Sequence, residues 1–174
     1  MHSRTRLLAF VVTALATPAT STVASAALHP GTVAERPSDP PDSARIKSLL
    51  QKADAAMFGG KLGEARSLYR QLINEQRDAQ QYEREALWRL VNSYLMDDDI
   101  SSAASVLDEL AQSAARYGDP SMELTSTFEA AVYHQRLKRP VIVAEHVTRI
   151  KALLQSPAIT AHEREDYARR LVVK

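Results

Sequence analysis

Histidines and carboxylates are the residues of this chain that could perform chemistry. His162 and Glu163 begin like the helix of a zinc protease, in which a second histidine four residues after the first completes the metal site. Asp166 occupies that position, so the motif is not formed. His134 and His146 lie in different predicted helices, and the chain has no cysteine. We expect each of them on a helix surface or in a groove rather than as a metal ligand.

One acidic stretch has the spacing of a calcium-binding loop. Asp97, Asp99 and Ser101 follow that pattern, and Asp108 stands in the place of the closing glutamate. Ser102 occupies the position at which such a loop needs glycine. Carboxylates favour the N-termini of helices, so we expect these acidic residues to cap a helix instead of binding calcium.

The glycines and lysine at residues 59–61 lack the strand and the spaced glycines of a phosphate loop. The sequence shows neither an activated serine nor a nucleophilic cysteine. We therefore expect no catalytic residue, no cofactor and no metal ion. The alternative is an enzyme whose site is built in a helical bundle from His134, His146 and acidic residues.

The elements that position these residues begin after an N-terminal segment that predicts a cleaved signal peptide. Arg4 and Arg6 precede an apolar run at 7–17, and Ala24 and Ala26 stand where a signal peptidase reads small residues. This run has about half of the roughly 20 apolar residues that a membrane span needs. We expect cleavage of residues 1–26 and a periplasmic or extracellular protein without a membrane segment. A retained membrane anchor is the alternative.

Composition limits the remaining chain to one domain of ordinary charge. Residues 1–26 contain two of the 22 lysines and arginines, so 20 basic residues then face 21 acidic ones, without the clustered positive charge that nucleic acid or an anionic membrane requires. Residues 27–41 contain four prolines and predict a flexible or extended leader. Residues 42–174 then form the predicted folded domain, which must rely on an apolar core because it has no disulfides.

From Asp42 onward the apolar residues recur with helical period. Asp42 or Ser43 caps a first helix that continues to Met57, and Gly60 ends it because glycine adopts the left-handed conformation at little cost. A second helix begins at once, and its Ala65 is small enough for a partner helix to approach closely. The short turn predicts that these two helices pack antiparallel.

This helical hairpin is repeated along the chain. Ala65, Ala103 and Ala144 occupy the same position in three copies and are 38 and 41 residues apart. A small residue at this position would allow each pair of helices to cross closely. The predicted hairpins cover approximately residues 44–78, 81–117 and 120–155.

The repeated residues resemble the tetratricopeptide repeat family. The matching positions are Ala53, Gly60, Leu62, Ala65, Tyr69 and Leu72 in the first copy, and Val91, Tyr94, Ile100, Ala103, Leu107 and Leu110 in the second. The usual period is 34, so the longer spacing here indicates lengthened helices or linkers. The third copy lacks the turn glycine. The resemblance implies an all-α, right-handed superhelical stack of about three hairpins.

Capping residues support the same division of the chain. Gly118 ends one helix, and Asp119 with Pro120 begins the next. Thr160 and Glu163 have the spacing of a capping box, which predicts a seventh helix at 160–172. Its apolar residues are Tyr167, Ala168 and Leu171. We expect this helix to cover the last hairpin, as terminal repeats must.

The resemblance also implies a concave groove lined by the first helix of each hairpin, where a partner would bind. The residues expected there are Asp54, Met57, Phe58, Trp88, Arg89, Asn92, Met96, Glu129, Tyr133 and Arg136. Trp88 fits either this groove or the core between hairpins. We predict a non-catalytic module that binds a peptide or helix of a partner protein. A self-assembling structural spacer or adaptor is the alternative.

Overall fold

The computed structural model describes residues 43–172, which form seven α-helices and no strand. The all-α prediction is therefore confirmed, whereas the predicted signal peptide and leader lie outside the described residues. None of these helices is long and apolar enough to cross a membrane. Their bounds are α1 Ser43–Phe58, α2 Leu62–Asp78, α3 Arg84–Leu95, α4 Ile100–Tyr117, α5 Pro120–Arg136, α6 Pro140–Leu153 and α7 Ala161–Val172.

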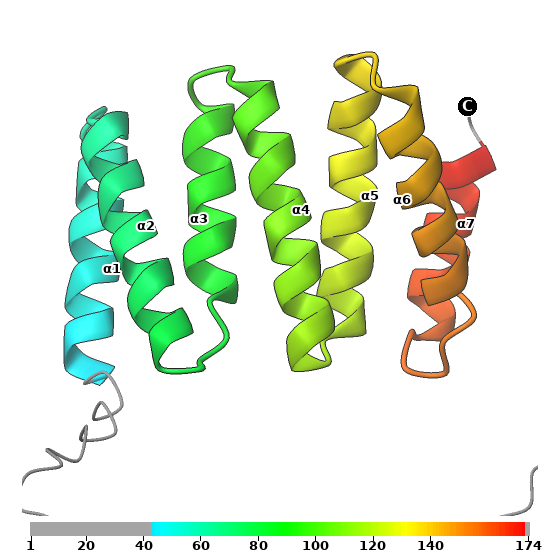
Figure 1. Cartoon of the computed structure of the whole chain (residues 1–174), viewed down its shortest axis with the longest axis horizontal. Coiled ribbons are helices and arrows are strands. Elements are labelled where there is room, and N and C mark those ends of the chain that lie inside the picture. The colour runs from blue at the N-terminus through cyan, green and yellow to red at the C-terminus, as the bar shows by residue number, and fades with distance from the viewer. Residues whose placement is uncertain (1–42, 173–174) are drawn as a thin grey trace, which may run out of the picture. The chain divides into compact units, whose positions relative to one another are not determined.

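Successive helices run antiparallel and stand side by side in a row (Figure 1). Each helix from α1 to α5 packs against the next one in the chain, and α1 also contacts α3. The hairpins α1–α2, α3–α4 and α5–α6 match the three predicted copies in extent. The three hairpin turns all lie along the same edge of the row, at the top of Figure 1.

Each of the five turns that join α1 to α6 contains one residue in the left-handed conformation. Gly60 and Gly118 have φ of 75° and 69°, as the sequence predicts. Gln80, Asp98 and Lys138 have φ of 54°, 57° and 55° in the other three turns. Lys138 thus replaces the glycine that the third copy lacks, although its side chain makes this conformation more costly.

The predicted caps of α4, α5 and α7 are present, whereas Asp42 lies outside the described residues. Asp99 and Asp119 each accept a hydrogen bond from the backbone N–H three residues ahead, at 3.0 Å. At α7, the Thr160 N–H donates to the Glu163 carboxylate at 2.9 Å, and the Glu163 N–H donates to the Thr160 hydroxyl at 3.2 Å. These local contacts set where the helices begin, because they satisfy N–H groups that have no partner within the helix.

Two small residues of the repeat pattern are buried and the third is not. Ala65 and Ala103 are fully buried in the core shared by the first two hairpins, as expected. Ala144 is exposed, so its predicted role in helix packing is wrong. The reason is that α6 buries only Ile150 and Leu153, near its C-terminus, and leaves its first half outside the core.

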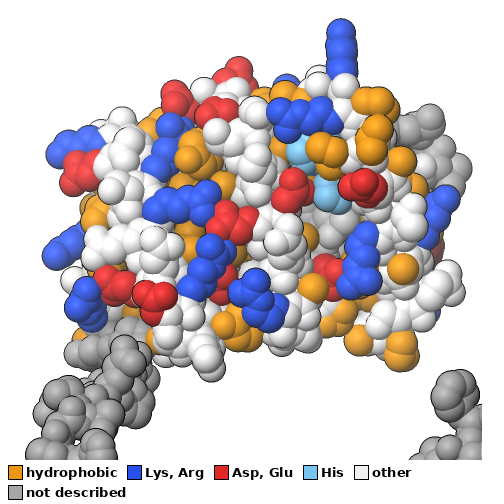
Figure 2. Space-filling model, viewed as in Figure 1, with side chains coloured by type: hydrophobic (Ala, Val, Ile, Leu, Met, Phe, Trp, Pro, Cys, Tyr) orange, Lys and Arg blue, Asp and Glu red, His pale blue; other side chains and the backbone are white. Residues whose placement is uncertain are grey.

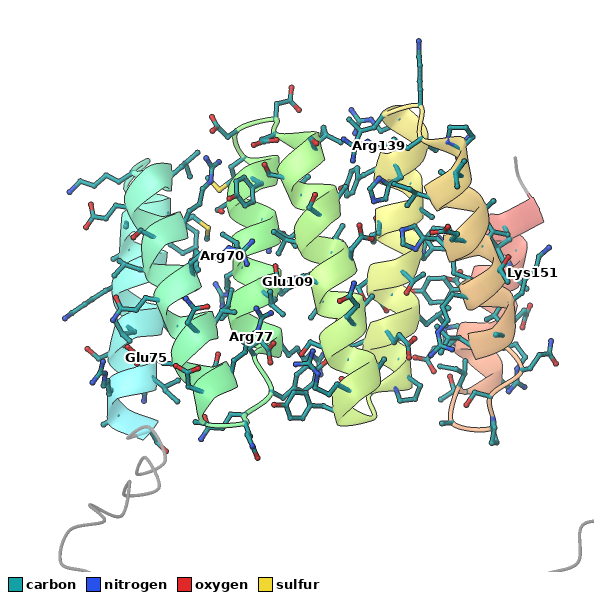
Figure 3. The ribbon with its side chains drawn as sticks, in the orientation of Figure 1. Arg70, Glu75, Arg77, Glu109, Arg139 and Lys151 are labelled. Carbon is teal, nitrogen blue, oxygen red and sulfur yellow. The ribbon has the colours of Figure 1, made fainter. Side chains whose placement is uncertain are left out.

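A charged network joins the first hairpin to the second (Figure 3). Arg70 and Arg77 of α2 both donate to Glu109 of α4, at 2.7 and 2.6 Å. Arg77 also donates to Glu83 at 2.8 Å, and the Glu83 side chain is fully buried. A buried carboxylate requires such a partner, so this network fixes how the two hairpins sit together.

Helix α7 covers the third hairpin through only a few side chains. The Tyr167 ring meets Phe128 edge-on at 5.2 Å between centroids, and its hydroxyl lies 3.0 Å from that of Thr125. Leu171 is partly buried against the same apolar cluster. Ala168 is exposed, so its expected contribution to the cover is wrong. No described side chain of α7 is fully buried, so this helix covers the third hairpin with little buried surface of its own.

Candidate functional site

A cleft of about 400 Å³ opens between α3, α5 and α7, with one contribution from α4. Its floor is apolar, and aromatic and polar side chains surround the opening. The lining residues are Trp88, Val91, Asn92, Leu95, Leu107, Thr125, Glu129, Tyr133, Tyr167 and Arg170.

The cleft brings together part of the predicted groove. Trp88 and Asn92 from α3 meet Glu129 and Tyr133 from α5. Trp88 is partly buried, packs against the main core and also lines the cleft, so both interpretations of this residue apply. Its position explains why a sequence pattern assigns it equally well to core and groove.

Arg170, which the sequence analysis did not single out, forms the α7 side of the cleft. Its guanidinium lies 4.2 Å from the centre of the Phe128 ring, 5.1 Å from that of Tyr167 and 3.2 Å from the Glu129 carboxylate. Cation–π contacts and the ion pair hold this side chain against α5. Its place in the cleft depends on how α7 docks, which no local sequence signal specifies.

Asp54 and Arg89 do not line the cleft but belong to a neighbouring network. The Tyr69 hydroxyl donates to Asp54 at 2.6 Å, and Arg89 lies 3.4 Å from the other oxygen of that carboxylate. Arg89 also donates to Glu85 at 2.8 Å. Burial, with the hydrogen bond to Asp54, raises the pKa of Tyr69 far above its usual value. These charges hold α1, α2 and α3 together.

The remaining predicted groove residues lie near the turns, away from the cleft lining. Phe58 and Met96 are 76% and 58% exposed, just where α1 and α3 end. Arg136 is exposed beside the Tyr133 ring, at 6.0 Å from its centre. Met57 is buried in the core, so its assignment to the groove is wrong. Met57 and Phe58 are consecutive residues of α1 and therefore point in different directions, so that Met57 faces the core and Phe58 faces solvent.

A second opening, which the sequence analysis missed, lies between α5, α6 and α7. This cavity has a volume of about 460 Å³ and a mainly apolar lining that includes Phe128, Val132, Val143 and Val147. Its origin is the exposed first half of α6. The available signal was the spread of apolar residues over 141–147, which is wider than one helix face needs.

Asp108, His134 and His146 form a cluster between α4, α5 and α6. The His134 Nε2 atom lies 2.9 Å from Asp108 Oδ2, and His146 Nε2 lies 3.0 Å from Asp108 Oδ1. The two imidazole rings stack with centroids 5.4 Å apart. His134 is only 2% exposed, so the expectation of a surface or groove position is wrong for this residue. His134 and His146 each lie six residues from Pro140, at the turn between α5 and α6. Residues equally far from the turn of a helical hairpin lie at the same height, and this spacing could have predicted that the two histidines meet.

The carboxylate of this cluster is held in its charged form. Burial alone would raise the pKa of Asp108, but the imidazoles of His146 and His134 outweigh burial, and the pKa lies below its usual value. The calcium-loop pattern does not assemble around it. Asp99 caps α4, as predicted for these acidic residues, whereas Asp97 forms an ion pair with Arg66 at 3.0 Å.

Comparison with protein-family models, with curated proteins and with solved structures found no match to this chain. Function is therefore argued from the cleft, the cavity and the side-chain cluster.

Proposed function

We propose that this chain is a non-catalytic module that binds a peptide segment or a single helix of a partner protein in the cleft between α3, α5 and α7. The observation that carries the proposal is the gathering of Trp88, Tyr133 and Tyr167 around one opening with a polar rim. Aromatic and arginine side chains are the common anchors of protein interfaces.

The cleft suits a short segment with one or two large apolar side chains. About 400 Å³ is enough for such anchors but not for a folded surface. On the rim, Asn92 offers an amide, and the exposed pair of Glu129 and Arg170 offers charges of both signs. A helix that places apolar residues three or four positions apart could fill the floor and reach this rim.

The wider setting of the module is also part of the proposal. The regular row of antiparallel hairpins supports a stack of the tetratricopeptide type that curves as a right-handed superhelix. The sequence pattern at 1–26 supports export to the periplasm or the exterior of the cell. The partner would then be a protein of the same compartment.

Site-specific photo-crosslinking tests the cleft. A photoreactive residue at Asn92, in protein produced without residues 1–26, should crosslink one partner from a cell-envelope extract, and Tyr133→Ala should weaken that product. The matched control is Ser105, an exposed α4 residue that does not line the cleft. Equal products from both positions, or none from position 92, would contradict the proposal. Trp88 is the only tryptophan, so its fluorescence reports binding of the identified segment directly.

The self-assembling spacer remains a second candidate because of the open cavity beside α6. Val141 is 71% exposed, and Ala144 is exposed in the same part of the helix. If this surface pairs two copies, sedimentation will show a dimer that Val141→Glu converts to monomer. A monomer throughout the micromolar range would leave the binding module as the function.

A further inference from the structure

We propose that Asp108, His134 and His146 bind one divalent transition-metal ion of the zinc class between α4, α5 and α6. This site is separate from the cleft, and it does not depend on the proposed partner binding. Each helix contributes one ligand, so the ion would tie the second hairpin to the third.

The three side chains already lie at nearly the spacing that a metal ion requires. Their ligand atoms all fall within 4.8 Å of one another, and the two contacts with Asp108 measure 2.9 and 3.0 Å. Zinc binds imidazole nitrogen and carboxylate oxygen at about 2.0–2.2 Å, so tetrahedral ligand atoms stand roughly 3.3 Å apart. Small rotations of these side chains would therefore bring them around one ion.

The cluster contains buried polar atoms that lack an aligned hydrogen bond among the described residues. His146 Nε2 and Asp108 Oδ1 face each other at 3.0 Å, yet neither makes an aligned hydrogen bond with any described residue. Leaving such atoms unpaired costs free energy. A cation between them would satisfy both atoms together with His134 Nε2. A structural ion pair would need only one imidazole, whereas two converge here on a single carboxylate.

The surroundings favour a metal with nitrogen ligands. One helical turn from each ligand lies a fully buried apolar residue, namely Ala104, Ala130 and Ile150. Each ligand is thus next to the dry interior of the fold, while Asp108 and His146, at 28% and 17% side-chain exposure, give access from solvent. Figure 2 shows histidine and acidic side chains reaching the surface together at this place.

The number and type of the ligands select the ion. Calcium and magnesium prefer six or more oxygen ligands, which this cluster does not provide. Two imidazoles and one carboxylate match a zinc-class ion, with a fourth position left for water or an external ligand. The single negative charge of the ligand set also favours a divalent cation.

Zinc titration of the full chain without an affinity tag tests the site. Competition with a chromophoric chelator should give one zinc per chain at this site, and cobalt should show the visible absorption of a four- or five-coordinate ion. His146→Gln and Asp108→Asn should each weaken zinc binding by about a hundredfold or more. Both side chains are partly exposed, so these variants are expected to fold.

The matched control is His162→Gln, because His162 is exposed on α7, outside the cluster. It should bind zinc like the wild type. Zinc should raise the melting temperature of the wild type and of this control, but not that of His146→Gln. Zinc binding that is equal in wild type and His146→Gln, or absent at millimolar zinc, would overturn the proposal.

Discussion

Tyr69 illustrates how one buried side chain can serve both packing and polar recognition. Its ring is fully buried in the main core, and its hydroxyl donates to Asp54 at 2.6 Å. The sequence pattern predicts the ring correctly, because a large residue at this position recurs in the repeat. It predicts Asp54 as a groove residue, whereas that carboxylate is occupied by Tyr69 and Arg89.

We expect Tyr69→Phe to lower the free energy of unfolding by about 1–2 kcal/mol. The substitution removes a hydrogen bond to a charged acceptor and preserves the ring. Urea unfolding monitored by circular dichroism measures the change. The matched control is Tyr117→Phe, since the Tyr117 ring is stacked on Tyr82 and partly exposed. Equal effects of the two substitutions would mean that the Asp54 bond contributes no stability.

At the scale of the helices, Ala65 and Ala103 lie at closely packed helix crossings, whereas Ala144 lies on the exposed part of α6. Ala65→Leu and Ala103→Leu should each destabilise the fold by about 1–3 kcal/mol, because a larger side chain overpacks a filled helix crossing. Ala144→Leu should change stability by no more than about 0.5 kcal/mol, since Ala144 is exposed. Denaturant midpoints compare the three variants. If Ala144→Leu is as destabilising as the others, the open packing of α6 is wrong.

The capping box of α7 makes that helix sensitive to acid. Hydrogen bonds from Thr160 hold the pKa of Glu163 below its usual value of 4.5. The folded state therefore gains stability from this carboxylate above pH 4.5 and loses it as the pH falls through the lowered value.

The wild type should accordingly melt higher than Glu163→Gln near neutral pH, and the difference should shrink on acidification below pH 4.5. Thermal melts across this range provide the measurement. Glu165→Gln is the control, because Glu165 only pairs with Arg169 on the exposed side of α7. A difference between wild type and Glu163→Gln that does not depend on pH would argue against a stabilising charged cap.

The helix ends that the sequence predicts correctly are those fixed by residues close together in the chain. Gly118, Asp119 and the pair Thr160–Glu163 act on their own backbone, so their roles follow from neighbouring residues alone. The packing of α6 and the docking of α7 depend on contacts between distant segments. Single-sequence periodicity marks an apolar residue but does not say what covers it, which is why Ala144 and Ala168 were assigned wrongly.

At the scale of the whole molecule, the apolar side chains of residues 43–172 form two clusters. One joins α1 to α4 and reaches Ala130 of α5, and the other joins α5, α6 and α7. The cleft, the cavity and the histidine cluster all involve the third hairpin, in which α6 buries only Ile150 and Leu153. The sequence identified four of the ten residues that line the cleft, namely Trp88, Asn92, Glu129 and Tyr133. The sequence joined His134 and His146 with acidic residues only as an alternative, and it did not specify Asp108, because the members of the cluster come from three helices.

The three turn residues with side chains in the left-handed conformation make the fold less stable than it would be with glycine at these positions. Gln80, Asp98 and Lys138 adopt a conformation that costs a residue with a side chain roughly 1 kcal/mol, partly offset by the extra freedom of glycine when unfolded. We expect the triple replacement by glycine to raise the free energy of unfolding by about 1–2 kcal/mol, because distant sites add. A lower melting temperature of the triple variant would contradict this, because the greater freedom of glycine in the unfolded chain would then outweigh the relief of the strained conformation.

None of these three residues lines the α3–α5–α7 cleft or belongs to the histidine cluster. The glycine variant would thus be a reinforced background with both proposed sites intact. It would tolerate substitutions at buried positions that unfold the natural chain. His134→Gln, the substitution that removes the most buried of the three proposed metal ligands, could then be examined in a folded protein.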